Sequence, residues 1–431
     1  MRRKDAHPAR TAWFVVAGLV AFMLVLAGCG GSDDSGSTSG GGGEELQQLG
    51  KGEGQLNLIS WAGYAEPEWV EPFEAETGCK VTDKIAGTSD EMVALMRTGQ
   101  YDGVSASGDA SLRLIAAGDV APVNLDLIPN YENVFEGLKN QPHNTVDGGD
   151  VDPVNVSLVP NYKTVFPDLK NQPYNTFDGQ PYGIPHGRGA NLLMWNASDV
   201  KPAPTSWDVT LDPKVAAQYQ GKISQYDDPM SIAEGAVYLK FHEPDLGIEN
   251  PYELNEEQFE AAVDLLKEQG PNVGEYWSDA AKQIQAFANG DNQVGTTWQY
   301  QFFALQGEGE PVEASPASQG FLPKEGATGW SDTWMISNKA KHPNCMYEWM
   351  NWIIEPKVNA EVAEVFGEAP AQSLACDQTA DKEFCTKYHA DNPAFWKRVY
   401  YWETPVAECG NGEDDCMDYN AWVRAWTEIK G

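Results

Sequence analysis

The sequence is poor in basic side chains, with 29 Lys and Arg against 64 Asp and Glu and a formal net charge of -35 over 431 residues. A nucleic-acid-binding surface needs clustered Lys and Arg, so this composition argues against nucleic acid as a partner. It argues equally against attachment to anionic lipid through a basic face. Hydrophobic residues make up 42% and aromatic residues 11%, enough for a folded core. A chain of this length predicts two domains or lobes.

The sequence also lacks the motifs of common catalytic classes. Its six His form no HExxH pair, and neither a GxSxG elbow nor a P-loop occurs. Carboxylate pairs such as Asp227-Asp228 occur, but 64 acids make such pairs expected by chance. No pattern supplies a nucleophile together with its base. We therefore expect no catalysis, no cofactor and no metal, and we keep an exported hydrolase with two carboxylates as a rival interpretation.

The first thirty residues predict export. A basic start precedes an uncharged apolar run over residues 11–28, the order typical of a secretory signal. The run ends in Leu26-Ala27-Gly28-Cys29, which resembles the bacterial lipobox, in which the Cys is lipidated. We expect residues 1–28 to be a signal peptide and Cys29 to anchor the chain to the cell membrane. An uncleaved anchor is the alternative, and both place the chain in the periplasm or at the cell exterior.

Six cysteines remain after Cys29, and an even number in an exported chain predicts disulfides. Short loops favour the pairs Cys376–Cys385 and Cys409–Cys416, because local closure costs little entropy. Cys79 and Cys345 would then pair across a long separation. A metal site is the alternative, but the sequence has no CxxC.

From residue 55 the pattern alternates between strand and helix. We expect strands at residues 56–60, 79–83 and around Val104, and helices at 67–77, 89–97 and 110–117, with Ser89 as an N-cap. Such alternation predicts a parallel sheet covered by helices. Ligands of such sheets lie at the carboxyl ends of the strands. Here those ends are residues 60–64 and 105–109.

Further along, residues 190–195 and 293–298 predict strands of a second lobe. Helices are expected at residues 257–268, 279–289, 345–354 and 358–366. A tandem repeat interrupts the pattern: residues 119–148 and 150–179 are identical at 20 of 30 positions. Two copies are too few for a solenoid, so we interpret the repeat as a duplication in a surface loop, with the second copy continuing the fold.

Aromatic residues recur at expected element boundaries, beside carboxylates or small polar groups. The sets are Trp61 with Tyr64, Trp277 before Asp279, Trp298, and Trp330 with Asp332. Aromatic faces and carboxylates together suit an organic ammonium ligand, through cation–π attraction and charge-assisted hydrogen bonds. The alternative is that these tryptophans pack the core.

Several short motifs, in order, resemble ABC-transporter solute-binding proteins, most closely the spermidine/putrescine-binding group. They are Ile59-Ser60-Trp61, Phe73-Glu74-Ala75-Glu76-Thr77-Gly78, Tyr101-Asp102 with Ser107, Tyr182-Gly183-Ile184-Pro185, Thr205-Ser206-Trp207, and Gly367 with Pro370. The resemblance covers roughly residues 55–375. It implies an α/β, type II periplasmic-binding-protein fold, in which two lobes joined by a hinge close on a ligand in the cleft between them.

The resemblance also implies roles for individual residues. Trp61 and Tyr64 match the family's aromatic platform, Asp228 and Asp332 match acids that hold amines, and Trp298 matches a stacking ring. Two positions depart from the pattern: Gly108-Asp109 follows Ser107 where polyamine binders tend to carry an aromatic, and Ser231 replaces an acid. The expected ligand-binding set is Trp61, Tyr64, Ser107, Asp109, Asp228, Trp277, Trp298, Trp330 and Asp332.

These observations together predict a lipid-anchored, monomeric receptor of an ABC importer that binds a small, polyamine-like cation and docks on permease subunits. A receptor for an amino acid derivative or a sugar is the alternative. Residues 29–54 are expected to be a flexible tether, since Gly30–Gly43 contains only Gly, Ser, Thr and Asp. The expected lobes are residues 55–186 with 300–354, and 187–299 with 355–431.

Overall fold

A computed structural model describes residues 46–122, 124, 127, 161, 164–166, 169, 176–177, 180–315, 322–409 and 415–431. The chain divides into residues 1–41 and 42–431, and every described residue belongs to the second unit. The expected signal peptide, Cys29, most of the tether and most of the tandem repeat lie outside the described residues. Among the described residues, no helix is long and apolar enough to cross a membrane.

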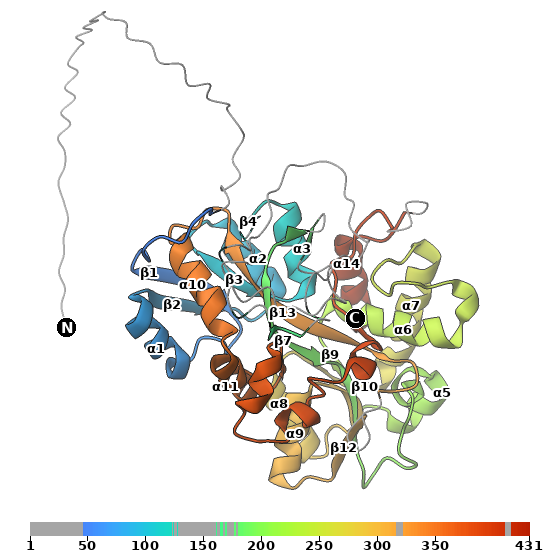
Figure 1. Ribbon diagram of the computed structural model, residues 1–431. Coiled ribbons are helices and arrows are strands. Elements are labelled where there is room, and N and C mark those ends of the chain that lie inside the picture. Colours follow the sequence, from blue (N-terminus) through green and yellow to red (C-terminus); the bar gives the residue numbers. More distant parts are fainter. Residues whose placement is uncertain are drawn as a thin grey trace, which may run out of the picture. The chain divides into compact units, whose positions relative to one another are not determined.

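The first sheet has the strand order β14-β7-β13-β3-β1-β2, and β15 and β4 also pair with β13. Its strands are β1 (Gln55–Ser60), β2 (Lys80–Ile85), β3 (Gly103–Ala106), β4 (Val120–Ala121), β7 (Ile184–Ala190), β13 (Ala327–Ser337), β14 (Ala369–Pro370) and β15 (Val399–Tyr401). The strand β1 pairs in parallel with β2 and β3, as the alternating sequence pattern predicts. The accompanying helices are α1 (Pro67–Thr77), α2 (Ser89–Arg97), α3 (Gly108–Ala116), α10 (Pro343–Ile353) and α11 (Pro356–Phe366) (Figure 1).

Local sequence explains the ends of these helices. The helix α1 begins at Pro67, buries Trp69 and Phe73, and ends at Gly78, whose φ of 75° is the left-handed conformation that glycine adopts readily. The predicted N-cap of α2 is wrong by one residue. Thr88 is the cap, and its side chain accepts a hydrogen bond from the backbone N–H of Glu91 at 3.1 Å.

The second sheet has the order β10-β9-β11-β8-β12. Its strands are β8 (Leu192–Asn196), β9 (Ile223–Tyr226), β10 (Val273–Trp277), β11 (Val294–Thr297) and β12 (Val312–Ser315), and a separate hairpin joins β5 (Thr176–Phe177) to β6 (Gln180–Pro181). Its helices are α4 (Asp208–Leu211), α5 (Pro213–Ala216), α6 (Ile232–His242), α7 (Glu256–Gln269), α8 (Ala280–Ala288), α9 (Gln299–Glu308) and α14 (Tyr419–Lys430). Short 3₁₀ turns are η5 (Ala217–Tyr219), η6 (Pro229–Ser231), η7 (Pro244–Leu246) and η8 (Gly270–Asn272). The strand β9 is parallel to both β10 and β11, so the carboxyl ends of these three strands lie at one edge.

Strand pairing distributes the chain between the sheets differently from the boundaries expected at residues 299/300 and 354/355. The strand β12 pairs with β8 of the second sheet, whereas β14 and β15 pair with β7 and β13 of the first. The reason is that these strands form hydrogen bonds with strands far away in the sequence, and the order of elements along the chain does not reveal which strands pair. Only Asn191 separates β7 from β8, so one residue carries the chain from the first sheet to the second.

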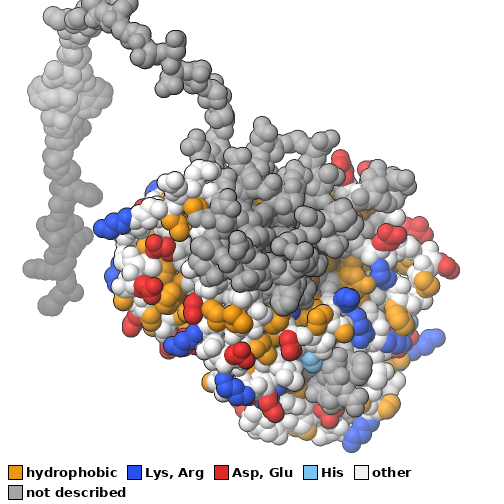
Figure 2. Space-filling model, in the orientation of Figure 1, with side chains coloured by type: hydrophobic (Ala, Val, Ile, Leu, Met, Phe, Trp, Pro, Cys, Tyr) orange, Lys and Arg blue, Asp and Glu red, His pale blue; other side chains and the backbone are white. Residues whose placement is uncertain are grey.

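The later chain adds η9 (Ser373–Asp377), α12 (Phe384–Lys387) and α13 (Pro393–Trp396), and α14 packs against α7. The three expected disulfides are confirmed: Cys79–Cys345, Cys376–Cys385 and Cys409–Cys416. The first of them ties the start of β2 to α10. The side of the molecule in Figure 2 shows acidic and basic side chains interspersed, without a field of one sign.

Candidate functional site

The centre of the candidate site is a buried hydrogen-bonded group on the first sheet. Tyr64 follows β1, Ser107 is the N-cap of α3, and Asp332 lies within β13. The Tyr64 hydroxyl lies 2.7 Å from Asp332 Oδ2, and the Ser107 hydroxyl donates to Asp332 Oδ1 at 2.5 Å. Asp332 is 2% exposed, and burial raises the pKa of its carboxyl to about 6. The structure therefore brings three of the predicted residues together.

A connected group of aromatic rings lies where the strands of the second sheet end. Tyr226 ends β9, Trp277 ends β10, and Trp298 directly follows β11. The Trp298 ring meets Trp277 edge-on at 5.0 Å and Tyr226 at 5.2 Å between ring centroids. This is the edge at which parallel sheets bind ligands.

Two rings associated with the first sheet complete this group. Trp330 of β13 meets Trp298 edge-on at 6.2 Å, and Trp402, which follows β15, stacks on Tyr226 at 5.7 Å with an interplanar angle of 11°. The aromatic group therefore joins the two lobes.

The predicted tryptophans differ in how much surface they leave for a ligand. Trp298 and Trp61 are half-buried, whereas Trp277 is 2% and Trp330 is 5% exposed. The indole N–H of Trp277 donates to Thr296 O at 3.2 Å, and that of Trp298 donates to Asn191 Oδ1 at 3.0 Å. Trp277 thus packs behind Trp298 as support, and Trp298 presents the more accessible ring.

Asp109 and Asp228 form a second acidic centre. Asp109, in the first turn of α3, accepts a hydrogen bond from the Ser89 hydroxyl at 3.1 Å, and Asp228 caps η6 by accepting from Met230 N at 2.8 Å. Burial raises the pKa of both carboxyls, and the charge of Asp109 raises that of Asp228 further.

The two acidic centres share Tyr226 as a neighbour. Burial raises the pKa of this phenol, and the charges of Asp228, Asp109 and Asp332 all raise it further. Acids of both lobes, Asp227 among them, therefore contribute to the electrostatic surroundings of this one phenol.

Arg113 provides a cation beside Asp109. Its guanidinium lies 3.8 Å from Asp109 Oδ2, 2.5 Å from Asp90 Oδ1 and 4.2 Å from the ring centroid of Tyr419 in α14. The Thr404 hydroxyl donates to Asp109 O at 2.7 Å. The C-terminal segment that leads into the second lobe therefore also contacts α3 of the first.

Sequence reasoning missed four residues of this region: His186, Tyr226, Glu368 and Trp402. Tyr226 directly precedes the quoted Asp227-Asp228 pair, and Glu368 directly follows Gly367 of the resemblance, so adjacency to a motif was the available signal. Glu368 is fully buried, and its Oε2 lies 2.8 Å from the Tyr64 hydroxyl. Trp402 belongs to no motif and is brought to the site by the pairing of β15.

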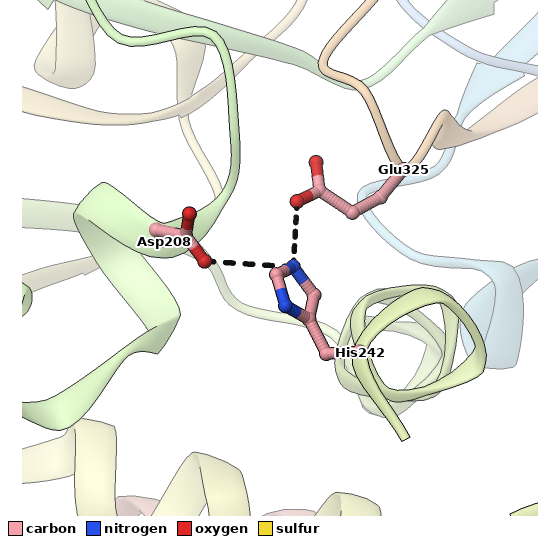
Figure 3. A group of neighbouring side chains, drawn as sticks. All are labelled: Asp208, His242 and Glu325. Carbon is pink, nitrogen blue, oxygen red and sulfur yellow. Dashed lines mark hydrogen bonds and ion pairs between the residues drawn. The ribbon is translucent and has the colours of Figure 1, made fainter. Parts of the chain in front are cut away.

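Asp208, His242 and Glu325 form a separate cluster whose ligand-type atoms lie within 4.8 Å of one another, the arrangement of a possible metal site (Figure 3). These atoms already have partners: His242 Nε2 lies 2.9 Å from Glu325 Oε1, and Lys324 Nζ lies 3.1 Å from Asp208 Oδ2. Lys324 Nζ also lies 3.7 Å from Glu325 Oε1, so its ammonium group already supplies a positive charge beside both carboxylates. We interpret the cluster as an ion-pair link between α4, α6 and the segment before β13.

The ligand-free protein is expected to lose stability as pH rises from 6.5 to 8.5. Burial raises the pKa of Glu368 to about 8 and those of Glu234 and Glu403 to about 7. Above pH 6.5 these acids are ionised in the unfolded chain but still partly protonated in the folded protein. Because the folded state binds more protons, its stability falls as pH rises. Buried His186, whose pKa is lowered to about 4, acts oppositely only below pH 6.5. Thermal denaturation across this range checks the sign, and a rising midpoint would contradict it.

Comparison with known proteins identifies the class. Residues 68–394 match the family model of bacterial extracellular solute-binding proteins, and the chain belongs to that family. The spermidine/putrescine-binding periplasmic protein of Escherichia coli K12 is 25% identical over 332 residues, covering 76% of this chain and 80% of that protein.

Solved structures share the fold. A Listeria monocytogenes protein assigned to spermidine/putrescine ABC transport has a TM-score of 0.66 at 17% identity, covering 88% of this chain and 99% of that one. The substrate-binding protein PotD of Streptococcus pneumoniae has a TM-score of 0.63 at 18% identity, covering 87% and 97%. The predicted two-lobed, type II α/β fold is therefore confirmed. The chain is therefore an extracellular solute-binding protein, and the Listeria and Streptococcus proteins that share its fold are named as parts of ABC transporters.

Proposed function

We propose that this receptor binds a small organic cation, of the polyamine type, between its two lobes, without catalysing any reaction. The observation that carries the proposal is the buried carboxyl of Asp332, which accepts hydrogen bonds from Tyr64 and Ser107 and lies in the same strand as Trp330, whose ring meets Trp298 of the other lobe. Burying a carboxylate is costly unless it is paired with a cation. Among the described residues Arg113 forms an ion pair with Asp109, and neither buried Asp332 nor half-buried Asp228 takes part in one. A ligand with ammonium groups would pair the others, and the half-buried ring of Trp298 offers a face for its carbon chain or charge.

The functions of the relatives support this ligand class, since several are spermidine-, putrescine- or cadaverine-binding proteins. The replacement of an aromatic by Asp109 adds a carboxylate at the site. We therefore place the ligand among small cations with at least two positive charges, and leave the length of the carbon chain to experiment.

A ligand screen tests this function. The purified receptor is heated with putrescine, spermidine, neutral amino acid derivatives and sugars, and the hits are measured by calorimetry. A polyamine should raise the melting temperature and bind without turnover. Stabilisation by a sugar alone would favour the alternative solute class, and hydrolysis of a glycan or ester would favour the exported hydrolase.

We further propose that Cys29 carries a lipid that holds the receptor on the outer side of the membrane, that it acts as a monomer, and that it delivers its ligand to permease subunits. The lipobox-like sequence before Cys29 and the Gly- and Ser-rich segment after it support the anchor. Cells grown with labelled fatty acid should incorporate the label into the wild-type receptor and not into Cys29→Ala. Equal labelling of both would refute the anchor.

A further inference from the structure

The hydroxyl of Tyr64 has one proton and two carboxyl neighbours. Its oxygen lies 2.7 Å from Asp332 Oδ2 and 2.8 Å from Glu368 Oε2, both hydrogen-bond distances. A phenol donates one hydrogen bond, so it satisfies only one of the two carboxylates. The other contact is a hydrogen bond only if the carboxyl itself carries a proton and donates it to the phenol oxygen. The geometry therefore requires one additional proton on the two acids.

We propose that Asp332 and Glu368 hold one proton between them through Tyr64, and that the ligand's ammonium group displaces this proton when it binds. Only the displacement of the proton by a ligand rests on the proposed function, because the shared proton follows from the structure without a ligand. Glu368 is then a positioning and specificity-determining residue that sets the charge of the site.

The surroundings of Glu368 favour its neutral form. The side chain is fully buried, and burial raises its pKa to about 8, compared with about 6 for Asp332. At neutral pH the proton therefore resides on Glu368. Tyr64 accepts from it and donates to Asp332, which stays negative and also accepts from Ser107.

Among the residues that the structure describes, the other groups beside this network bring no compensating charge. The ring of His186 meets Tyr64 edge-on at 4.3 Å, its Nδ1 lies 3.7 Å from Glu368 Oε1, and its Nε2 lies 2.8 Å from the Ser105 hydroxyl. Burial lowers the pKa of His186 to about 4, so this ring is neutral at pH 7. Burial raises the pKa of Tyr388, which follows α12, and the charges of Tyr300 and Glu368, when ionised, raise it further, so this phenol is also neutral at pH 7.

Arg188 follows Gly187 on β7 but directs its guanidinium elsewhere. It donates to Ala390 O at 2.9 Å and stacks over the ring of Trp396 at 4.1 Å. Gly187 itself makes room for the acid, because a Cβ there would lie 1.9 Å from Glu368 Cδ. Glu368 Oε1 is buried without a hydrogen-bond partner among the described residues, and an arriving ammonium could satisfy it.

The exchange balances in atoms and charge. The ligand brings an ammonium group, the carboxyl O–H bond breaks, and the proton passes to the solvent buffer. The site then changes from one negative charge to two as the cation arrives. Because binding and proton release are linked, affinity should rise by up to about tenfold per pH unit below the pKa of the pair and level off above it.

Two measurements on the full-length receptor test the proposal. Carbon-13 NMR of carboxyl-labelled Glu should show one resonance, absent in Glu368→Gln, that is protonated at pH 7 and titrates near pH 8. Calorimetry with putrescine or spermidine in buffers of different ionisation enthalpy should show close to one proton released by the wild type and almost none by Glu368→Gln. Glu403→Gln is the matched control, since Glu403 has a raised pKa but is hydrogen-bonded by Asn250 away from Tyr64.

Each outcome has a distinct meaning. An ionised Glu368 at pH 7 would overturn the shared proton whether or not any ligand is found. Ligand binding without proton release, or equal release by Glu368→Gln, would overturn the displacement. If no amine binds while Glu368 is protonated, the proposed function fails and the shared proton stands. If Glu368→Gln does not fold, the Glu368 resonance is assigned instead from the change in its chemical shift in Tyr64→Phe.

Discussion

Replacing Asp332 by Asn should weaken binding of a polyamine by about a hundredfold, because truncating one partner of a buried charge pair typically costs 2–5 kcal/mol. Asp332 is 2% exposed and accepts hydrogen bonds from Ser107 and Tyr64. Solvent therefore does little to screen its charge, and water would not compensate for the lost charge in the variant. Calorimetric titration of both proteins with the ligand found in the screen measures the loss. An unchanged affinity would remove Asp332 from the site.

The same substitution should leave the fold intact. Burial disfavours the ionised form of this carboxyl, so a neutral Asn of equal size is expected to keep or slightly raise the melting temperature. Asp119→Asn is the matched control. Asp119 is also a buried acid of the first lobe, but it pairs with Arg97 at 3.1 Å, and its loss should not alter ligand affinity.

Removing the Cys79–Cys345 disulfide should have the largest effect on stability. It joins residues 266 positions apart, and the chain-entropy relation gives about 6 kcal/mol for a loop of that length. The double variant Cys79→Ser/Cys345→Ser should therefore unfold at much lower denaturant concentration. Urea denaturation followed by tryptophan fluorescence provides the measurement.

The disulfide Cys409–Cys416 serves as the comparison, since its residues are 7 positions apart and the same relation gives about 2 kcal/mol. If both double variants lost equal stability, the long-range link would not constrain the unfolded chain as expected. Ligand affinity should change little in either variant at temperatures where both remain folded.

Much of the fold was predictable because it is local. Trp69 and Phe73 recur at helical spacing after Pro67, and α1 has the predicted bounds. It was harder to predict which strands belong to which sheet. The strands β14 and β15 are 2 and 3 residues long, too short for a sequence pattern, and each is defined by partners far away in the chain.

The candidate site divides in the same way. Asp332 and Tyr64 could be named from short motifs, and the structure brings them together at 2.7 Å. Glu368 could not, because its importance comes from burial against Gly187 and from a phenol 304 positions away. Likewise, Trp277 and Trp298 look equivalent in sequence, and only packing distinguishes the supporting ring from the more accessible one.

Asn191 links the junction between the two sheets to the tryptophan rings, so tryptophan emission should respond to ligand binding. It stands between β7 and β8, donates to Thr328 Oγ1 at 2.7 Å, and accepts from the Trp298 indole at 3.0 Å. A rotation at this junction therefore turns an indole ring that touches two other indoles, Trp277 and Trp330. We expect the receptor to report its own closure through the intensity and polarisation of its ultraviolet emission, without an attached dye.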